Sequence, residues 1–510
     1  MRTDKKIISI SAGDLSIEDL ISIARHNVPI ELSKEVEGKI IQARDLIDKF
    51  VDEQRVVYGI TTGVGDNSKV RVSKAESRKL QKNLIRSHAC GVGAPLDMEL
   101  VKAVMVMMIK NLSSGYSGIR LETVQALVKL VNHNIVPKVP RDGSLGYLSY
   151  QAHISLVLLG EGEAYYKGEL LKGDIALKRA GLKPISLYEK EGLSLINGTV
   201  DMTAIGAIAI YDAINVLKIA DLASMVSFEA LKGTNLAFDV RLGDVKPHPG
   251  LKSTIYNLNR LLSGSEIAEK FKNHRTQDAL SIRAIPQVHG ACKDALNYAK
   301  QVIEREMNSA TDNPLIFVSE GDSVSSANCH GESVAMALDF LAISLSETAN
   351  ISERRIFRLV SSQYSELPPF LVENSGVNSG YMIPQYVAAA LVSDNKLYSH
   401  PAVVDSIPTA AGQEDHVSMG TSASLKVLKV IANTQRVMGI ELMCACQGLE
   451  FLRPLRSSTG IETVYNFLRS YIPKLEEDKV LYDDIKKVET LIKTEKVLDI
   501  LENKIGQLVI

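Results

Sequence analysis

Long segments with apolar residues at helical spacing fill much of the second half of this chain, and they constrain its fold more than any other feature. Apolar residues recur at positions i, i+3 and i+4 within residues 200–232, 291–310, 332–359, 385–399 and 421–448. The first segment is apolar on most faces and carries small residues such as Ala204 and Gly206. A helix that is apolar all round must be covered on every side. We therefore predict a mainly α fold with a central bundle of long helices, buried within an oligomer.

The composition is that of a globular protein, and it argues against some functions. Hydrophobic residues make up 45% of the 510 residues and charged residues 23%, with a net charge of −2. This balance gives no reason to expect binding to nucleic acid or to an anionic membrane surface. Charged residues interrupt the apolar stretches before about 18 residues, so we predict no transmembrane helix. The start, Met1–Lys6, is charged and lacks an apolar leader, which indicates a cytoplasmic protein.

The cysteines and histidines predict neither a disulfide nor a metal site. The five cysteines are an odd number without disulfide spacing, which fits a reducing cytoplasm. Cys444 and Cys446 could form a metal or redox pair, but residues two apart do not face each other on a helix. We predict that both are buried structural thiols. No regular ligand spacing with carboxylates is found for His330, His400 and His416.

Sequence patterns divide the chain into three predicted domains. Residues 1–199 form an N-terminal domain with the active-site loops, residues 200–450 form the long-helix bundle, and residues 451–510 form a charged, amphipathic helical cap. The N-terminal domain begins as a small mixed region, with a short strand around Ile8 and a helix entrance at Ser16.

Polar and glycine-containing motifs occur in a specific order along the chain. They are VYGITTGVG at 57–65, LIRSHACGVG at 84–93, GSLGYLSYQAH at 143–153, LINGT at 195–199, QDALSIRAIPQVHG at 277–290, TDNPL at 311–315 and QEDHVSM at 413–419. In order and spacing they resemble the motifs of the histidine and phenylalanine ammonia-lyase family, over nearly the whole chain. The resemblance implies a histidine ammonia-lyase-like (fumarase/aspartase-like) helical bundle. It also implies a homotetramer in which subunits share each active site.

The resemblance assigns catalytic roles to residues whose chemistry suits an elimination. Tyr58 matches the tyrosine that removes the β-proton, which requires a lowered phenol pKa. The alternative is a tyrosine that closes a turn, and a phosphate-binding loop is disfavoured because its lysine is absent. Arg283 matches the arginine whose planar fork binds the substrate α-carboxylate. The alternative is that Arg283 forms an ion pair that stabilises the fold.

Further matching residues are candidates for substrate binding. His88 and Glu414 match residues that contact the substrate side chain in histidine-type members, so Glu414 indicates an imidazole or thioimidazole ring. The alternative for His88 is a histidine satisfied within the core. Asn197 and Gln277 match polar positions near substrate or cofactor, although either could be a buried amide that satisfies loop backbone. Met382 is a candidate for contact with the substrate, and its neighbours include no lysine to grip a thioimidazole sulfur.

The chain departs from the family where the family builds its electrophile. In the family, Ala-Ser-Gly follows the Gly-Ser-x-Gly tetrapeptide and cyclises to methylidene-imidazolone (MIO), which activates the substrate amine. Here Tyr147 follows Gly146 directly, and the register resumes at Leu148 only if three residues are deleted. Other departures also surround the position of the ring: Thr61 replaces Asn, Tyr150 replaces Pro, Leu280 replaces a second catalytic Tyr, and Cys329 replaces Phe. We predict no MIO and no other cofactor.

Without MIO, the leaving group must depart unaided. Ammonia is a poor leaving group, whereas a trimethylammonium group departs as a neutral amine. Its fixed positive charge suits the faces of aromatic rings, and Tyr147 and Tyr150 stand where the MIO ring would have been. Both tyrosines are candidates for the trimethylammonium site, and Tyr147 also for proton transfer. The alternative is that they fill the volume that the deletion vacates.

The pattern is most similar to ergothionases, the MIO-lacking members that eliminate trimethylamine. It implies a carbon–nitrogen lyase acting on a small imidazole or thioimidazole betaine, converting ergothioneine to thiourocanate or hercynine to urocanate. Ergothioneine is favoured because its acidified ring better stabilises developing charge. One alternative is a histidine ammonia-lyase, which converts histidine to urocanate and ammonia, with Ala-Ser-Gly missing from the sequence as written. Another is a non-catalytic tetrameric binding protein. Aminomutase chemistry is disfavoured because it uses the same missing electrophile.

Overall fold

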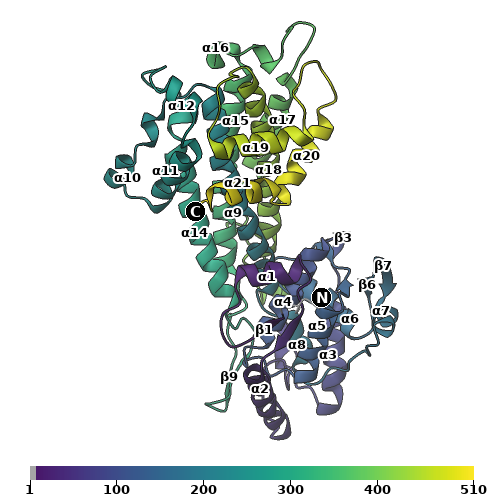
Figure 1. The fold of residues 1–510 in the computed structure, drawn as a ribbon. Coiled ribbons are helices and arrows are strands. Elements are labelled where there is room, and N and C mark those ends of the chain that lie inside the picture. The colour runs from purple at the N-terminus through teal and green to yellow at the C-terminus, as the bar shows by residue number, and fades with distance from the viewer. Residues whose placement is uncertain (1–6) are drawn as a thin grey trace. The chain divides into compact units, whose positions relative to one another are not determined.

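The structure, a computed structural model, describes residues 7–510, and it divides into two compact units (Figure 1). Unit 1 contains the described part of Met1–Tyr211 together with Lys300–Leu338 and Ala402–Leu425. Unit 2 contains Asp212–Ala299, Asp339–Pro401 and Lys426–Ile510. The charged start Met1–Lys6 lies outside the described residues, so the expectation of no leader stays a prediction.

The predicted long helices are present. They are α9 (Val200–Ala230), α14 (Ile285–Met307), α15 (Glu332–Val360), α17 (Met382–Tyr398) and α18 (Gly420–Glu450). All but α17 continue from one unit into the other, so four of the five boundaries between the units fall within helices, and the fifth, between Pro401 and Ala402, falls in the loop after α17. The division into domains 1–199, 200–450 and 451–510 stays a prediction.

Unit 1 begins with helices whose starts are set by serine caps. The side chains of Ser16, Ser33 and Ser73 accept hydrogen bonds from backbone N–H groups of the first turns, which have no partner within the helix. The helices wholly within this unit are α1 (Ile17–Ala24), α2 (Lys34–Asp52), α3 (Lys74–His88), α4 (Met98–Leu112), α5 (Leu121–Asn132), α6 (Ser149–Leu158), α7 (Gly173–Arg179) and α8 (Glu191–Ile196), with 3-10 turns η1 (Gly65–Lys69) and η4 (Ala410–Gly412).

Small sheets complete unit 1 and give it the mixed character that the sequence predicts. A parallel pair joins β1 (Ile8–Ile10) to β2 (Ile30–Leu32), with Ile8 opposite Ile30. The antiparallel pairs are β3 (Val92–Pro95) with β5 (Pro140–Asp142), β6 (Glu163–Tyr166) with β4 (Val136–Pro137) and β7 (Glu169–Lys172), and β8 (Leu315–Phe317) with β9 (Asp322–Val324).

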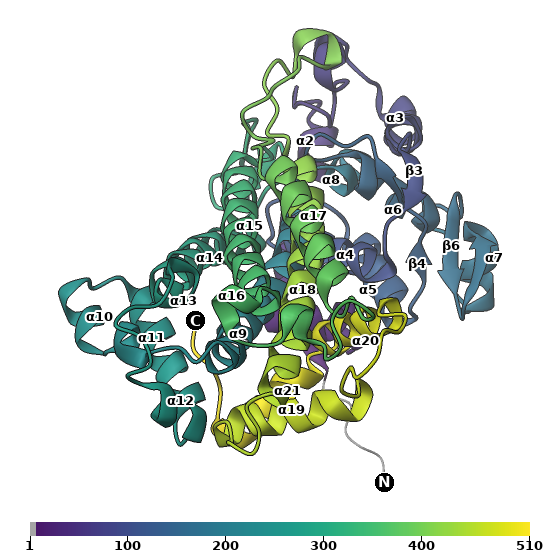
Figure 2. The same cartoon turned by 90° about the horizontal axis from the view of Figure 1, so that it is seen from above.

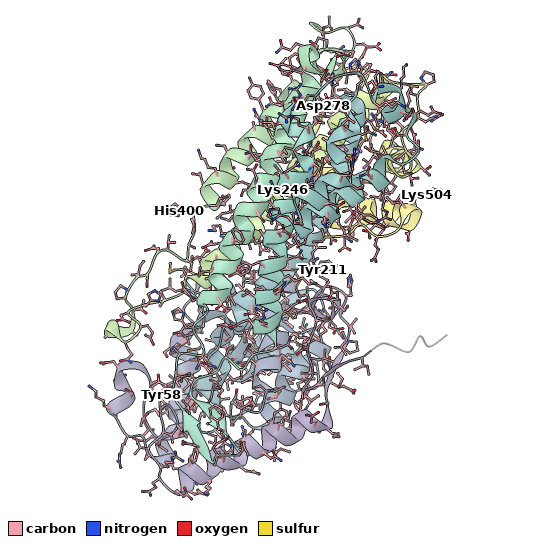
Figure 3. All side chains as sticks on the ribbon, turned by 90° about the vertical axis from the view of Figure 1, so that its left-hand side faces the viewer. Tyr58, Tyr211, Lys246, Asp278, His400 and Lys504 are labelled. Atoms are coloured by element: carbon pink, nitrogen blue, oxygen red, sulfur yellow. The ribbon has the colours of Figure 1, made fainter. Side chains whose placement is uncertain are left out.

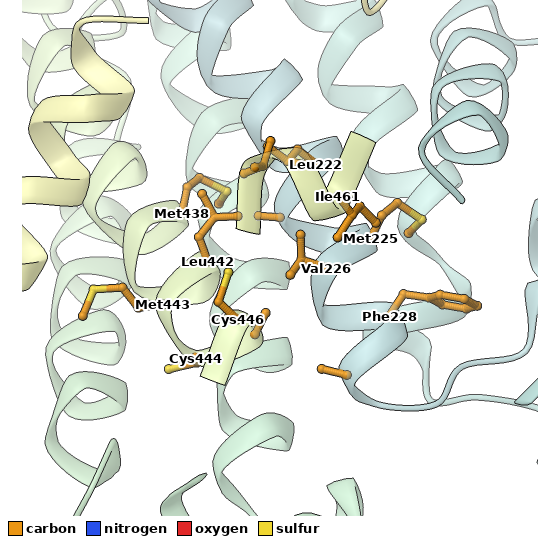
Figure 4. Close-up of a cluster of buried hydrophobic side chains, with 14 of the residues drawn as sticks. Leu222, Met225, Val226, Phe228, Met438, Leu442, Met443, Cys444, Cys446 and Ile461 are labelled. Atoms are coloured by element: carbon orange, nitrogen blue, oxygen red, sulfur yellow. The ribbon is translucent and has the colours of Figure 1, made fainter. Parts of the chain in front are cut away.

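Unit 2 is built around apolar faces of the long helices. Figures 1 and 2 show α15, α17 and α18 side by side, and all three contribute buried residues to one core. Met225, Phe228 and Leu442 in this core are 0% exposed (Figure 4), and burial of such a side chain contributes about 1.5–3 kcal/mol. The remaining elements are η2 (Asn235–Phe238), α10 (Arg241–Val245), α11 (Pro249–Leu262), α12 (Glu266–Phe271), α13 (Leu280–Arg283), α16 (Ser362–Ser365), η3 (Pro369–Leu371), α19 (Thr459–Tyr471), α20 (Tyr482–Lys493) and α21 (Lys496–Ile505).

Two helical stretches, Glu191–Ala230 and Glu332–Val360, are long and apolar enough to cross a membrane by length and composition. Charged residues still interrupt both stretches, as the sequence predicts, at Asp201 and Asp212 in the first and at Asp339 and Glu347 in the second. The apolar window is completely buried in the first stretch and 67% buried in the second. Helices in the core of a bundle share this composition, because neighbouring helices cover them on every side.

The five cysteines are all free thiols. Cys444 and Cys446 are buried in the core of unit 2 (Figure 4), which confirms the prediction that they are interior residues. Burial raises the pKa of the Cys446 thiol to about 11. Cys90 is the exposed member of the set.

Candidate active site

Tyr58 lies in a turn of unit 1 between α2 and η1, where Figure 3 labels it. Its side chain is half-buried, and its hydroxyl oxygen accepts a hydrogen bond from the backbone N–H of Gly65 at 2.9 Å. This bond holds the phenol oxygen at the start of η1. The turn-closing alternative and a catalytic role are both compatible with this position.

The turn that carries Tyr58 is fixed by its own residues. The hydroxyl of Thr61, the residue that replaces the family's Asn, donates to the carbonyl oxygen of Arg55 at 2.7 Å. Gly59 has a φ of +65°, a conformation that favours glycine, and a Cβ there would lie 2.4 Å from Leu193 Cδ2. Glycine is therefore required at this point if Tyr58 is to keep its place.

The loop that carries Tyr147 packs tightly against other segments of unit 1. Gly146 leaves no room for a side chain, because a Cβ there would lie 2.8 Å from Ser418 Oγ and 3.1 Å from Met202 Cε. Tyr147, the next residue, is half-buried. The close packing of Gly146 thus fixes the point from which the Tyr147 ring extends.

Tyr150 lies inside unit 1. Its side chain is 0% exposed, and its hydroxyl donates to the carbonyl oxygen of Arg141. Burial raises the pKa of Tyr150. These contacts favour the alternative that Tyr150 fills interior volume, and they give no support to a place in the trimethylammonium site.

Tyr58, Tyr147, Cys329 and Glu414 lie close enough to interact electrostatically. Burial raises the pKa of Tyr58 and of Tyr147, and the negative charges of Glu414 and the Cys329 thiolate raise both further. Burial also raises the pKa of Cys329 to about 11. The Glu414 carboxylate makes no hydrogen bond to any residue within 7–510. These groups are neutral or negative in every protonation state, so a bound cation would be stabilised and would lower the phenol pKa values.

The residues of this loop do not fit an MIO group. MIO forms from Ala-Ser-Gly, and residues 143–150 contain no such tripeptide. Ser418 and Met202 already occupy the space beside Gly146. No step of a reaction is therefore assigned to MIO in this chain.

His88 and Asn197, two predicted substrate-binding residues, have different surroundings. The Nδ1 atom of His88 lies 2.8 Å from the carbonyl oxygen of Leu84, and because a carbonyl only accepts, Nδ1 carries the hydrogen. The Nε2 atom is left for another partner. Asn197 is buried, and its Nδ2 donates to Asp312 Oδ1 at 3.2 Å and to the Asn313 carbonyl oxygen at 2.9 Å. This bonding favours the alternative that Asn197 satisfies loop backbone.

Arg283 and Gln277 lie together in unit 2, at the end of α13 and just before it. With its amide oxygen toward the guanidinium group, Gln277 accepts from Arg283 Nε at 3.0 Å and from Nη2 at 3.1 Å. Among residues 7–510, Arg283 forms no ion pair, which disfavours the structural alternative. Both residues line a cavity of about 430 Å³ in this unit, together with Leu280, which is 63% exposed.

The predicted site residues divide between the units. Met382 is the half-buried first residue of α17 in unit 2, where Gln277 and Arg283 also lie. The candidates in unit 1 are Tyr58, His88, Tyr147, Tyr150, Asn197 and Glu414. Of these six, the electrostatic contacts bring Tyr58, Tyr147 and Glu414 together.

Sequence reasoning missed a buried carboxyl group, that of Asp201 in the first turn of α9. Asp201 Oδ2 accepts from the hydroxyl of Thr421 at 3.0 Å and from that of Ser144 at 3.4 Å. Burial raises the pKa of Asp201 to about 7. The available signal was a carboxylate at the start of a helical segment that is apolar on most faces. Through Ser144, this carboxyl group holds the loop that precedes Tyr147.

The structure also brings together potential metal ligands that sequence spacing left unrelated. One ligand atom each from His330, Glu332 and His416 lie within 4.8 Å of one another. The two histidines are 86 residues apart in the sequence, so no spacing motif could reveal the cluster. The prediction of no metal site rested on sequence spacing alone and stays a prediction, and this cluster is a candidate that spacing could not reveal.

The profile of a known family, "Aromatic amino acid lyase", matches residues 15–470. The chain belongs to this family. A histidine ammonia-lyase of Alkaliphilus oremlandii is 48% identical over 503 residues, which cover 98% of this chain and 99% of that one. The crystal structure of histidine ammonia-lyase from Trypanosoma cruzi is 41% identical, has a TM-score of 0.92, and is matched over 98% of this chain and 95% of that chain. The mainly α, histidine ammonia-lyase-like fold is confirmed.

The comparison with ergothionase corrects one expectation. The crystal structure of the ergothioneine-degrading enzyme ergothionase from Treponema denticola has a TM-score of 0.92, with 97% of this chain and 100% of that chain covered. It shares only 27% sequence identity with this chain. Ergothionase thus shares the fold, but the sequence is more similar to the histidine ammonia-lyases described above.

Proposed function

We propose that this lyase-family chain eliminates trimethylamine from a betaine of histidine type without an MIO electrophile. The observation that carries the proposal is the cluster of Tyr58, Tyr147, Cys329 and Glu414 at the loop that lacks Ala-Ser-Gly. None of these groups can carry a positive charge, and two of them present aromatic faces. Such a site suits a fixed cationic group, and it lacks the electrophile that activates a primary amine.

The elimination balances with the residues of this chain. Tyr58, as phenolate, takes the β-proton of the substrate, and the electron pair of that C–H bond forms the Cα=Cβ double bond. The Cα–N bond breaks toward nitrogen, so trimethylamine leaves as a neutral molecule and Tyr58 becomes a neutral phenol. Burial and Glu414 raise the pKa of Tyr58 in the free protein. The trimethylammonium charge of a bound substrate lowers the pKa of Tyr58. The substrate itself would therefore help to form the phenolate that acts as the base.

Other residues would bind and orient the substrate. Arg283 would bind the carboxylate through its fork of N–H donors, and the Gln277 amide oxygen would orient the guanidinium group. His88 and Glu414 would recognise the ring nitrogens, and Met382 would contact the apolar part of the substrate. Tyr147 would hold the trimethylammonium group or take part in proton transfer.

We also propose a homotetramer in which subunits share the active sites. Exposed apolar side chains on α17 support an extensive subunit contact: Ile383, Tyr386 and Leu397 are 56%, 66% and 69% exposed. Apolar patches of this kind mark protein–protein contacts. The free thiols support a reducing, cytoplasmic location. A preparation that is active as a monomer would contradict the shared sites.

Between the two betaines, the comparisons favour hercynine over ergothioneine. Hercynine carries the plain imidazole ring of histidine, and the 48% identical relative is named a histidine ammonia-lyase. The ergothionase is only 27% identical. The stronger acidity of the thioimidazole ring, which favours ergothioneine, is a property of the substrate rather than of this chain.

A second candidate function is histidine ammonia-lyase itself. The identity of 48% over almost the full length of both chains favours it. It requires Ala-Ser-Gly between Gly146 and Tyr147, so sequencing of the coding region and the intact mass of the purified protein decide whether it applies. A non-catalytic tetramer would bind these ligands without turnover.

The deciding experiment is a parallel assay of purified protein with histidine, hercynine and ergothioneine. Trimethylamine, ammonia and the absorbance of the unsaturated product are measured in each reaction. Release of trimethylamine with urocanate or thiourocanate supports the proposal and identifies the ring. Release of ammonia from histidine overturns it in favour of the second candidate, and binding without product supports the tetrameric binding protein.

A further inference from the structure

His330, Glu332 and His416 form a compact set of nitrogen and oxygen donors in unit 1. His416 Nδ1 lies 3.3 Å from His330 Nε2, and the two rings are stacked with centroids 5.4 Å apart. The ligand atom of Glu332 lies within 4.8 Å of both. Two ligand atoms that each lie about 2.1 Å from a tetrahedral zinc ion are about 3.4 Å from each other. The distance between the two histidine nitrogens therefore matches the distance between two ligand atoms of a tetrahedral zinc site.

Glu332 supplies an independent observation. Its Oε2 atom is buried and has no hydrogen-bond partner in the described chain. A buried carboxylate oxygen without a donor is costly. Glu332 is the first residue of α15, and the positive end of the helix dipole favours its charge but supplies no partner to this atom. A cation between Glu332 and the two histidines would satisfy it.

We propose that His330, Glu332 and His416 bind one divalent transition-metal ion, with zinc as the best fit. Two imidazoles and one carboxylate are a donor set that zinc takes with an open fourth position. Magnesium and calcium prefer sets made only of oxygen. His416 is exposed and His330 is half-buried, so an ion can reach the site from solvent.

A hydrogen bond between the two imidazoles explains only part of this arrangement. One ring must then donate and the other accept, which accounts for the 3.3 Å contact. It leaves Glu332 Oε2 without a partner. A bound cation accounts for both observations at once.

The proposed ion would tie together two segments that border the candidate active site. Cys329 directly precedes His330, and Glu414 lies two residues before His416. The ion would therefore position Cys329 and Glu414 relative to each other. It would act as a positioning element, independent of which substrate the protein takes.

Metal binding is tested directly, without an activity assay. Full-length protein is stripped with a chelator, dialysed and titrated with Zn²⁺ against a chromophoric competitor, and Co²⁺ is added to a parallel sample for its absorption spectrum. We expect one Zn²⁺ per chain and a Co²⁺ spectrum of low-symmetry, four- or five-coordinate type. The variants His416→Ala and Glu332→Gln should each bind at least about tenfold more weakly.

Two matched variants serve as controls. His400→Ala removes a histidine outside the cluster, and Cys90→Ser removes the exposed thiol that could bind zinc by itself. Both should bind zinc like the wild type. The proposal is overturned if the wild type binds no stoichiometric zinc, if the cluster variants bind it unchanged, or if Cys90→Ser abolishes binding. The Co²⁺ spectrum of the wild type remains decisive if a cluster variant fails to fold.

Discussion

The hydroxyl oxygen of Tyr58 accepts a hydrogen bond from the backbone N–H of Gly65 at 2.9 Å. This donor favours the phenolate form, because a hydrogen bond to the charged form lowers a pKa. Burial and the nearby Glu414 carboxylate act against it, and the net effect is a raised pKa of Tyr58 in the free protein. The proposed base therefore depends on the charge of its substrate.

Replacement of Tyr58 by Phe tests this dependence. We expect Tyr58→Phe to lower kcat for trimethylamine release by at least about 100-fold, since it removes the proposed general base. Because the pKa of Tyr58 is raised, only a small phenolate fraction exists at neutral pH, and wild-type kcat/KM should rise toward alkaline pH. The measurement is kcat/KM as a function of pH. Tyr116→Phe, at a tyrosine that is 41% exposed, is the matched control, and an undiminished rate in Tyr58→Phe would contradict the assignment.

Tyr147 is expected to act through its ring face rather than its hydroxyl group. Cation–π contact contributes about 0.5–2 kcal/mol, so Tyr147→Ala should raise KM for a trimethylammonium substrate by about 2- to 30-fold. Tyr147→Phe keeps the ring and should leave KM nearly unchanged. In contrast, Tyr150→Phe removes the hydrogen bond to Arg141 and should lower stability by about 1 kcal/mol without changing KM. An equal rise in KM in the Phe and Ala variants at Tyr147 would show that its hydroxyl group, not its ring face, contributes to substrate binding.

The long helices could be predicted from the sequence because their apolar periodicity is a local signal. The predicted segment 200–232 became α9 (Val200–Ala230), and 421–448 became α18 (Gly420–Glu450). Whether a helix is buried depends on which other segments pack against it, and this is not a local property of its sequence. The stretch that contains α9 is apolar enough to cross a membrane by composition and yet is buried inside the protein, because a helix covered by other helices and a helix covered by lipid have similar compositions.

The candidate site was predictable where a motif fixes a local turn, as around Tyr58, but not where the partner is distant in sequence. Asn197 bonds to Asp312, and this contact favours a structural role that its motif alone could not show. His330 and His416 meet across 86 residues. Contacts of this kind depend on how segments fold together, and no residue pattern within either segment encodes them.

Arg283 should contribute to substrate binding and little to stability, since it forms no ion pair among residues 7–510. Arg283→Lys keeps the charge but loses the planar fork. Loss of a charge-assisted hydrogen bond costs about 1.5–3 kcal/mol, so KM should rise at least about tenfold. The measurements are KM and the Tm. The matched control is Arg275→Lys in the same segment: Arg275 pairs with Asp278 at 3.3 Å and with Glu366 at 3.1 Å, so this variant should lower the Tm and leave KM unchanged. The opposite pattern would assign Arg283 to the structure instead.

Asp201 should make the stability of the protein depend on pH. Burial raises the pKa of this carboxyl group from 3.8 to about 7. Between these values the folded protein holds a proton that the unfolded chain has lost, so the free energy of unfolding falls as pH rises, by up to about 1.4 kcal/mol per pH unit. The destabilisation is absent below the unfolded pKa and complete above the folded one.

Asp201→Asn removes this titration and keeps an oxygen that can accept from Thr421. The Tm of the variant relative to the wild type should therefore be higher at about pH 8 than at about pH 5. Glu229, whose pKa burial also raises to about 7, is present in both proteins and cancels in the comparison. Asp14→Asn, at an exposed carboxylate, is the control and should give the same Tm difference at both pH values. A pH-independent difference for Asp201→Asn would mean that Asp201 is already ionised in the folded protein, held by its contacts with Ser144 and Thr421.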